Sequence, residues 1–180
     1  MSIELKSDRL TLRLPQQDDA ERIARYLNDF AVAGNLARVP FPYYLSDAEA
    51  WLHTRRDDLE PEETNFAIDL AGEGLVGHVG YHPGQDGNTI LGYWLGEPFW
   101  NRGIMTEAAA MAIDWYFSVT LAETVNSGVF AFNQASLAVQ KKLGFTEIGT
   151  SSLHCLARNA EVSHIDTLLT RKAWMESSRK

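Results

Sequence analysis

The sequence predicts an α/β fold of the mixed-sheet kind. We expect a mostly antiparallel central sheet of about seven strands with helices on both faces. The hydrophobic patterns follow the order strand, two helices, three strands, helix, strand, helix and two closing strands. The strand–helix–strand succession in the second half implies at least one parallel pair. Residues 90–95 are apolar on both faces, so this strand should be central and covered on both sides.

Length and composition indicate a single domain spanning residues 1–180. No apolar run reaches the roughly 18–20 residues that a membrane-spanning helix needs, and the N-terminus lacks the apolar segment of a signal peptide. The single cysteine, Cys155, has no partner for a disulfide or a thiolate metal cluster. We therefore expect a cytoplasmic protein with no metal site, in which Cys155 is a buried structural residue.

The net charge of −8 and the pI of about 5.1 disfavour binding to nucleic acids. A cationic partner is electrostatically favoured instead. The expected partner is an amine acceptor, with neither nucleic acid nor membrane, and a homodimer remains an option.

The first half of the chain contains strands and helices with recognisable boundaries. Residues 3–14 are expected to form one strand, and a helix follows from Asp18–Asp19 to about Asn28. Residues 30–45 contain three glycine or proline residues and should be irregular. Ser46 and Glu49 have the spacing of a capping box, which predicts a second helix through about Leu59.

The second half begins with a three-stranded meander, followed by a largely buried helix from Met105 to about Val119. Gly144 follows the next helix at the place of a left-handed cap. The predicted strands are 66–70, 75–82, 90–95, 124–132, 145–156 and 162–170, with a helix at 134–143 and a short polar helix or frayed end from residue 172.

The stretch from Tyr93 to Ala108 organises this arrangement. Pro98 ends the strand because proline has no backbone donor, and Gly103 allows a sharp turn and close approach of a ligand. The helix is expected to begin near Met105 or Thr106, with a threonine cap. A strand that leads through such a loop into a helix N-terminus directs several N–H groups to one point, which favours a phosphate.

With these elements in place, the chain resembles the GNAT N-acetyltransferase superfamily, specifically its RimJ/RimL-type branch. The resemblance extends nearly from end to end and rests on four stretches in order. They are Arg9-Leu10-Thr11-Leu12-Arg13 with Asp18-Asp19-Ala20; Pro40-Phe41-Pro42-Tyr43 with Asp47-Ala48 and Trp51; Tyr93–Ala108; and Asn133-Gln134-Ala135-Ser136 leading to Lys142-Leu143-Gly144-Phe145. At the cofactor loop, Trp100 and Met105 depart from the general superfamily pattern, although an aromatic residue in the first place is familiar in this branch.

The resemblance implies a GNAT-like fold, with acetyl-CoA as co-substrate. Its pantetheine arm would pair with the strand at Trp94, Leu95 and Gly96, and its diphosphate would rest on the loop amides. Asn133 would hydrogen-bond the pantetheine, unless it is only a turn residue or helix cap. The residues that would hold the diphosphate are Arg102, Gly103, Ile104, Met105 and Thr106.

Acetyl transfer to an amine by direct attack needs a neutral amine, a polarised carbonyl and a leaving thiolate, but no nucleophilic residue. Many superfamily members carry a tyrosine seven residues after the asparagine, and Gln140 has that place here. We therefore expect Ser136 to assist the leaving sulfur, the alternative being that Ser136 caps its helix. Candidates for the group that ends a proton relay are Glu97, which we expect to be catalytic, and the less favoured Asp69, His78 and His82.

An α-amino group is roughly one-tenth neutral at pH 7, whereas a lysine side chain is almost fully protonated. The expected function is therefore acetyl transfer to a primary amine, above all a protein or peptide N-terminus. A small-molecule amine acceptor remains open. A CoA-binding module without transfer activity also remains open, because of Met105 and Gln140.

Overall fold

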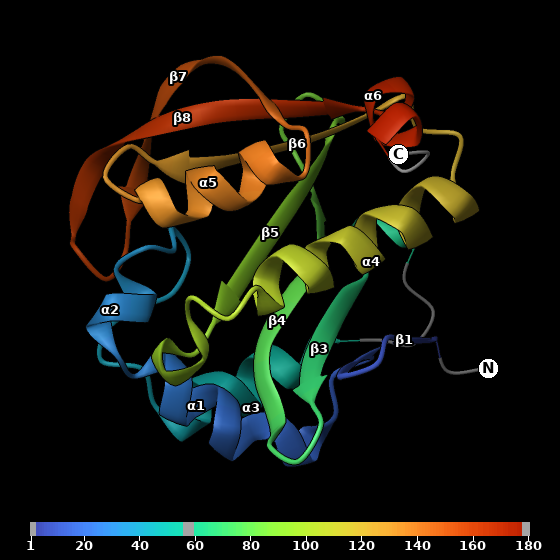
Figure 1. Cartoon of the computed structure of the whole chain (residues 1–180). Helices are drawn as coiled ribbons and strands as arrows, with labels where there is room; N and C mark the ends of the chain where they lie inside the picture. Colours follow the sequence, from blue (N-terminus) through green and yellow to red (C-terminus); the bar gives the residue numbers. More distant parts are fainter. Residues whose placement is uncertain (1–2, 56–59, 178–180) are drawn as a thin grey trace.

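A computed structural model describes residues 3–55 and 60–177. Its centre is one eight-stranded sheet in the order β1-β2-β3-β4-β5-β6-β8-β7 (Figure 1). The strands are β1 (Glu4–Lys6), β2 (Leu10–Arg13), β3 (Asn65–Leu70), β4 (Gly74–Pro83), β5 (Thr89–Leu95), β6 (Thr124–Phe130), β7 (Thr146–Cys155) and β8 (Ala160–Thr170). The β5–β6 pair is parallel and the other neighbouring pairs are antiparallel. The predicted fold class is confirmed.

The sheet has one strand more than the sequence predicted, because residues 3–14 form a hairpin and not a single strand. Ser7 turns the chain: its backbone N–H donates to the Leu10 carbonyl at 2.9 Å. Its hydroxyl accepts from the Leu10 backbone N–H at 3.0 Å. These two bonds separate β1 from β2, whose register pairs Leu5 with Leu12.

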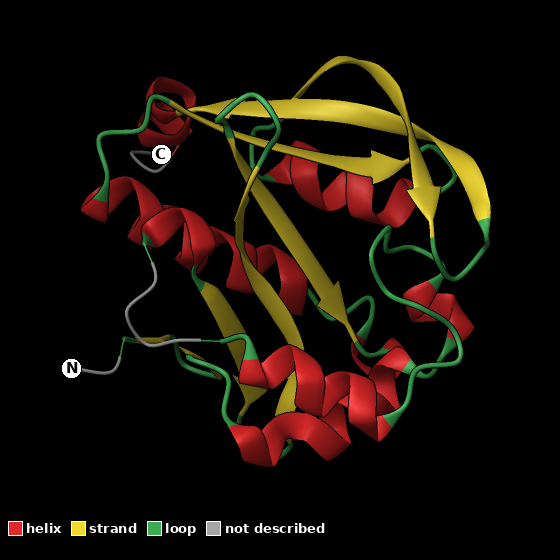
Figure 2. Cartoon of the chain, turned by 180° about the vertical axis from the view of Figure 1, so that it is seen from behind, coloured by secondary structure: helices red, strands yellow, loops and turns green. Residues whose placement is uncertain are grey.

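Helices cover both faces of the sheet, as expected (Figures 1 and 2). The long helices are α1 (Ala20–Leu27), α3 (Leu45–His53), α4 (Ile104–Val119) and α5 (Gln134–Lys142), with shorter α2 (Phe30–Ala33) and α6 (Arg171–Ser177). Trp51 of α3 contacts His78 of β4, whereas Tyr116 of α4 stacks on Tyr81 of the same strand. Since residues 78 and 81 point to opposite faces of a strand, α3 and α4 lie on opposite sides of the sheet.

The main core lies between α4 and the sheet. Six residues of α4 show no exposed surface or 1% at most, among them Ala108, Ala112 and Ile113. They face strand residues such as Phe66 and Val79, which are fully buried. The expectation that this helix is buried over most of its circumference is confirmed, because eight of its 16 residues are buried.

Two helix starts differ from the prediction. The α3 helix begins at Leu45, and the capping box is formed by Tyr44 and Asp47, whose carboxylate accepts from the Tyr44 backbone N–H at 2.7 Å. The predicted Ser46 cap is wrong because the helix has already begun there. This helix ends at His53, and the predicted end at Leu59 lies outside the described residues.

The α4 helix begins at Ile104 with Gly103 as its N-cap, so the predicted threonine cap is wrong too. In the described part of the chain, no helix is long and apolar enough to cross a bilayer.

Candidate active site

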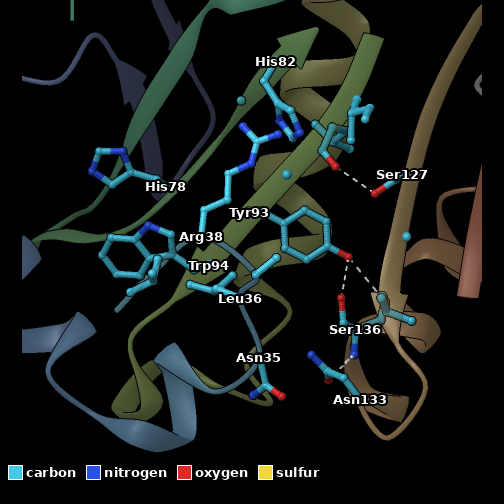
Figure 3. Close-up of a pocket in the computed structure, with 18 of the residues that line it drawn as sticks. Asn35, Leu36, Arg38, His78, His82, Tyr93, Trp94, Ser127, Asn133 and Ser136 are labelled. Atoms are coloured by element: carbon cyan, nitrogen blue, oxygen red, sulfur yellow. Dashed lines mark hydrogen bonds between the residues drawn. The ribbon is translucent and has the colours of Figure 1, made fainter. Parts of the chain in front are cut away.

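Strands β5 and β6 diverge and open a cleft in the middle of the sheet. Their described register pair is Ile90 with Asn126, close to one end of β5. Beyond this pair, the space between the strands belongs to an open cleft of about 2010 Å³. Strand alternation directs Tyr93 towards α5 and Trp94 towards α3, and Figure 3 shows the two side chains on opposite sides of β5. The cleft can therefore be entered from both faces of the sheet.

The rim of β5 directs backbone groups into this cleft. The Gly96 N–H donates to the Val76 carbonyl at 2.9 Å, so Gly96 faces β4. Backbone directions alternate along an antiparallel pair, so Tyr93 and Leu95 direct their N–H and C=O groups towards the opening. The Leu95 carbonyl accepts from Nε1 of Trp100 at 2.8 Å, which ties the following loop to the rim.

The loop before α4 adopts the left-handed backbone that the sequence suggested. Asn101 has φ 58° and Gly103 has φ 71°. The first helical hydrogen bond runs from the Glu107 N–H to the Gly103 carbonyl at 3.1 Å. The amides of residues 104–106 precede it and lack helical partners, as at every helix N-terminus. A Cβ on Gly103 would meet only Arg9 Nη2 within 4 Å, at 3.6 Å, so the space beside the Gly103 Cα is open.

The side chains of this loop leave that space clear. Ile104 and Met105 are 1% and 8% exposed and belong to the hydrophobic core. The bulk of Met105 therefore lies largely away from the loop surface. Arg102 extends over the Phe99 ring, with its guanidinium carbon 5.9 Å from the ring centroid.

A second arginine lies beside the α4 N-terminus. Arg9 Nε donates to Glu107 at 2.7 Å, and Arg9 Nη2 donates to the Arg102 carbonyl at 3.1 Å. Burial alone would raise the pKa of Glu107, but hydrogen bonds from Ser7 and Arg9 lower it below its usual value. Glu107 is therefore ionised and paired, which suits a helix N-terminal charge and not a base.

The N-terminus of α5 brings two predicted residues together with one that the prediction overlooked (Figure 3). Asn133 caps the helix: its Oδ1 accepts from the Ser136 backbone N–H at 3.2 Å. The Ser136 hydroxyl lies 2.9 Å from the Tyr93 hydroxyl, which also reaches the Ser136 carbonyl at 3.3 Å. Asn133, and not Ser136, therefore caps the helix through its side chain. The hydroxyls of Tyr93 and Ser136 both belong to residues that line the cleft.

Gln140 has a structural role in the same region. It is 1% exposed. Its Nε2 donates to Ser127 Oγ at 2.9 Å, and its Oε1 accepts from Thr167 at 2.6 Å. Ser127 in turn donates to the Leu91 carbonyl at 2.8 Å. This chain of bonds holds β5, β6, β8 and α5 together where the sheet opens.

Aromatic rings form the α3 side of the cleft. His78 stacks on Trp94 at 5.3 Å between centroids and meets Trp51 edge-on at 5.0 Å. The His78 ring is buried, and neither nitrogen has a hydrogen-bond partner among the described residues. Burial lowers the pKa of His78 to about 3, so the ring is neutral at neutral pH and a very weak base.

His82 lies further along β4, and Arg38 points towards it from the loop after α2 (Figure 3). Burial, and then the charge of Arg38, lower the pKa of His82 to about 4. Arg38 makes no ion pair with any described residue. This part of the cleft therefore favours neutral imidazoles and negative charge.

The loop of residues 34–38, called the 34–38 loop below, is hydrogen-bonded to the β7–β8 hairpin. Arg158 Nε donates to the Gly34 carbonyl at 2.7 Å, and the Leu156 N–H donates to the Ala37 carbonyl at 3.1 Å. Cys155 is fully buried, as predicted, and its thiol lies 3.5 Å from the Leu36 carbonyl. These contacts hold the loop over the cleft.

Two of the predicted proton acceptors lie elsewhere. Glu97 is on the exposed surface and is not among the residues that line the cleft. Its hydrogen bond with Asp29 raises its pKa above the usual value. Asp69 accepts from Arg13 Nε at 2.6 Å, and Arg13 also bonds Asp19, so this carboxylate belongs to a structural network.

Comparison with known families shows that residues 9–146 match the acetyltransferase (GNAT) domain. The chain belongs to the GNAT acetyltransferase family. Members of this family use acetyl-CoA as the acetyl donor, so the expectations of an acetyltransferase and of acetyl-CoA as co-substrate are confirmed.

Individual relatives agree with this GNAT assignment. The SPbeta prophage-derived uncharacterized N-acetyltransferase YokL of Bacillus subtilis (strain 168) is 28% identical over 144 residues, covering 79% of this chain and 78% of that protein. The structure of Mycobacterium smegmatis RimJ in complex with CoA-disulfide superposes with a TM-score of 0.79 at 20% identity, covering 95% of this chain and 87% of that one.

The ribosomal-protein-S5-alanine acetyltransferase of Vibrio fischeri has a TM-score of 0.76 at 21% identity, covering 96% of this chain and 98% of that one. These names are consistent with the RimJ/RimL-type branch of the GNAT superfamily.

Tyr93 is the site residue whose chemistry the sequence reasoning overlooked in this GNAT domain. It had been treated as part of a strand. Strand alternation contained the signal, because Tyr93 and Trp94 must face opposite sides of β5. The position of α5, which brings Ser136 to the Tyr93 hydroxyl, could not be read from that pattern.

Proposed function

We propose that this GNAT enzyme transfers the acetyl group to the α-amino group of a protein or peptide N-terminus. The observation that carries the proposal is the cleft itself. It joins an open helix N-terminus, a strand rim with inward backbone groups and a pair of hydroxyls. Bound acetyl-CoA would supply the acetyl group as a thioester, and every other requirement is met by groups of this chain.

The residues fit the donor in three places. The amides of residues 104–106, with the helix dipole and Arg102, suit a diphosphate. The inward backbone groups of Tyr93 and Leu95 suit an amide-containing arm such as pantetheine. Asn133 uses its Oδ1 as a helix cap, which leaves its side-chain N–H₂ group free to donate to the same arm.

Ser136 and Tyr93 suit the departure of the thiolate. Burial raises the pKa of Tyr93 above its usual value, so its hydroxyl remains protonated at neutral pH. In our proposal, Ser136 donates a proton to the leaving sulfur, and Tyr93 replaces that proton through their 2.9 Å contact. Tyr93 thereby supplies the phenolic proton donor that many superfamily members carry at the position of Gln140.

An N-terminal acceptor is supported by charge and by acid–base balance. The chain carries a net charge of −8, which favours a cationic acceptor over an anionic one. An α-amine needs little help from a base, since roughly a tenth of it is neutral at pH 7. The Vibrio fischeri structure is named as a ribosomal-protein-S5-alanine acetyltransferase, an enzyme with a protein acceptor. The alternative of a CoA-binding module without transfer activity rested on Met105 and Gln140. Neither residue supports it, because Met105 packs in the hydrophobic core and Gln140 has a structural role between the strands.

The test is an acceptor panel with acetyl-CoA, followed by thiol release and by mass detection of the product. The panel contains peptides with a free N-terminus and no lysine, N-terminally blocked peptides with one lysine, and small amines. We expect acetylation of the free N-termini. Preference for the blocked lysine peptides, or for small amines alone, would refute the proposed acceptor.

A further inference from the structure

Two glycines lie next to each other where the sheet opens. Gly92 on β5 and Gly128 on β6 each lie two residues beyond the parallel register pair Ile90–Asn126. Both therefore point to the α3 face of the sheet. Each glycine has a histidine above it. A Cβ on Gly92 would contact His82 Cε1 at 3.8 Å, and a Cβ on Gly128 would collide with the His164 ring, reaching Nε2 at 2.7 Å.

His164 differs from His78 and His82 because it is paired with a carboxylate. Its Nδ1 lies 2.8 Å from Asp166 Oδ1 on the same strand. The same oxygen accepts from the Ser151 hydroxyl of β7 at 2.9 Å. The His164 side chain is 15% exposed, and the Phe130 ring meets it edge-on.

This pairing decides which imidazole nitrogen is basic. An ionised carboxylate only accepts hydrogen bonds, so the proton of neutral His164 belongs on Nδ1. The lone pair is then on Nε2, beside Gly128. Among the described residues, Nε2 has no hydrogen-bond partner, and His164 lines the same cleft as Tyr93 and Ser136.

We propose that His164 is the general base of the reaction and that Asp166 is its positioning residue. The proposal rests on the function proposed above. The acceptor ammonium loses a proton to Nε2, and the neutral amine attacks the thioester carbonyl carbon. The C–N bond forms, the C–S bond breaks, and its electron pair leaves with the sulfur, which takes a proton from Ser136. The nitrogen of the new amide releases its second proton through water to the Ser136–Tyr93 pair, which is thereby restored. The proton on Nε2 later passes to water.

The surroundings favour His164 over His78 and His82. Asp166 places a carboxylate oxygen 2.8 Å from His164 Nδ1, whereas the charge of Arg38 lowers the pKa of His82. From β6, Phe130 and Gly128 lie against His164, and from β7 the Ser151 hydroxyl approaches it. The charged or titratable groups that line the rest of the cleft include Arg38, Asp47, Arg55, Glu63, His78, His82, Asp86, Lys142 and His154.

Histidine as a residue type also suits the proposed acceptor. In general, the reference pKa of a histidine side chain lies about 1.5 units below that of an α-amine but about 4 units below that of a lysine. A histidine–aspartate pair is therefore sufficient for an N-terminus. It would be a poor base for a lysine side chain.

The first experiment compares His164→Gln with the matched variant His154→Gln. His154 forms a similar pair, with Nδ1 3.1 Å from Glu161 Oε1. It also lines the cleft, but its side chain is 48% exposed, and strand alternation directs it to the face of the hairpin opposite His164. With a peptide that the wild type acetylates, we expect kcat/KM at pH 7 to fall about 100-fold for His164→Gln, typical of a lost general base. The loss should shrink towards pH 9, where the amine is neutral by itself. His154→Gln should remain within about twofold of the wild type, as a surface substitution should.

The second experiment uses Asp166→Asn, which keeps the imidazole and needs no acceptor. Nuclear magnetic resonance of the ¹⁵N-labelled His164 ring should show that the neutral ring is no longer held in the Nδ1–H tautomer, because an amide can donate as well as accept at Nδ1. With the same peptide, kcat/KM at pH 7 should fall about tenfold. If His164→Gln does not fold, this variant carries the test.

The outcomes separate the two proposals. An active wild type, with His164→Gln equal to His154→Gln, overturns the base and leaves the acetyl transfer intact. An unchanged His164 tautomer in Asp166→Asn overturns the positioning role. A wild type that acetylates no amine overturns the proposed function, and the role of His164 with it.

Discussion

The two sides of the cleft are built from different parts of the chain. The α4 side uses backbone amides of one continuous stretch, with the left-handed Gly103 before the helix. The α3 side uses side chains from four separate segments, among them Trp51, His78, Arg38 and His164. A donor shared by a whole family needs a constant set of backbone contacts. An acceptor that differs between members is better served by side chains that can be exchanged one at a time.

The largest effect is expected at Gly103, where a substitution tests whether the α4 side of the cleft binds the donor through its backbone. Gly103→Val should weaken acetyl-CoA binding by about 100-fold, because a β-branched residue is strained at φ 71° and the loop amides would be redirected. Asparagine tolerates this conformation, so Gly103→Asn is the matched control and should lose less than about tenfold. Calorimetric titration of the folded variants measures both. Unchanged acetyl-CoA affinity in Gly103→Val would mean that the diphosphate does not bind at this loop.

The next largest effect is expected for the hydroxyl pair of Tyr93 and Ser136, which lies between the two sides of the cleft. Ser136→Ala and Tyr93→Phe should each lower turnover by roughly ten- to a hundredfold, at the low end of general-acid effects. Acetyl-CoA affinity and melting temperature should stay close to wild type, since Asn133 and not Ser136 caps α5. The double variant should be little worse than either single one, because the two hydroxyls act as one donor.

Ser118→Ala is the control for this pair, because Ser118 is exposed and bonds only the backbone of its own helix. Turnover that holds in Ser136→Ala, together with a lower melting temperature, would mean that Ser136 is structural and that water protonates the sulfur.

The smallest effect sharpens the description of the α3 side. The pKa of His78 is about 3 in the folded protein, which is lower than in the unfolded chain, so His78 binds a proton more readily after unfolding. Stability should therefore fall as the pH decreases from about 6.5 towards 3, by up to about 1.4 kcal/mol per pH unit for this group.

His78→Phe removes this titration and should reduce the slope by that amount, as measured by urea unfolding between pH 6 and pH 4.5. His53→Gln is the control, since His53 is exposed at the end of α3. An equal slope in the wild type and in His78→Phe would mean that the ring is hydrated in the folded state.

The backbone-built side was largely predictable from the sequence, because its signals are local. The apolar strand, Pro98 and Gly103 follow one another within eleven residues, and the structure has the strand, loop and helix in that order. Boundaries were less predictable. The prediction of a Ser46 cap is wrong because Tyr44 and Asp47 form the capping box two residues earlier than the Ser–Glu pattern. The hairpin at Ser7 has no glycine or proline signal, because one serine makes that turn through its backbone N–H and its hydroxyl.

The side-chain-built side could not be derived in the same way. His164 and Asp166 lie two residues apart on a strand, so alternation already gave them a common face. Their relation to the active site depends on β8 pairing with β6 and not with β5, and on Gly128 leaving space for the imidazole. Such information is long-range, and a single sequence without its relatives does not contain it in readable form.

The bonds between the 34–38 loop and the β7–β8 hairpin have a consequence for protein engineering. Arg158, Leu156 and Cys155 all contact carbonyl oxygens of that loop, so the two segments recognise each other through backbone geometry. A loop grafted alone from a relative would meet a hairpin shaped for a different path. Specificity in this enzyme should therefore be transplanted as a pair of segments more than a hundred residues apart in the chain, exchanged together in one chimera.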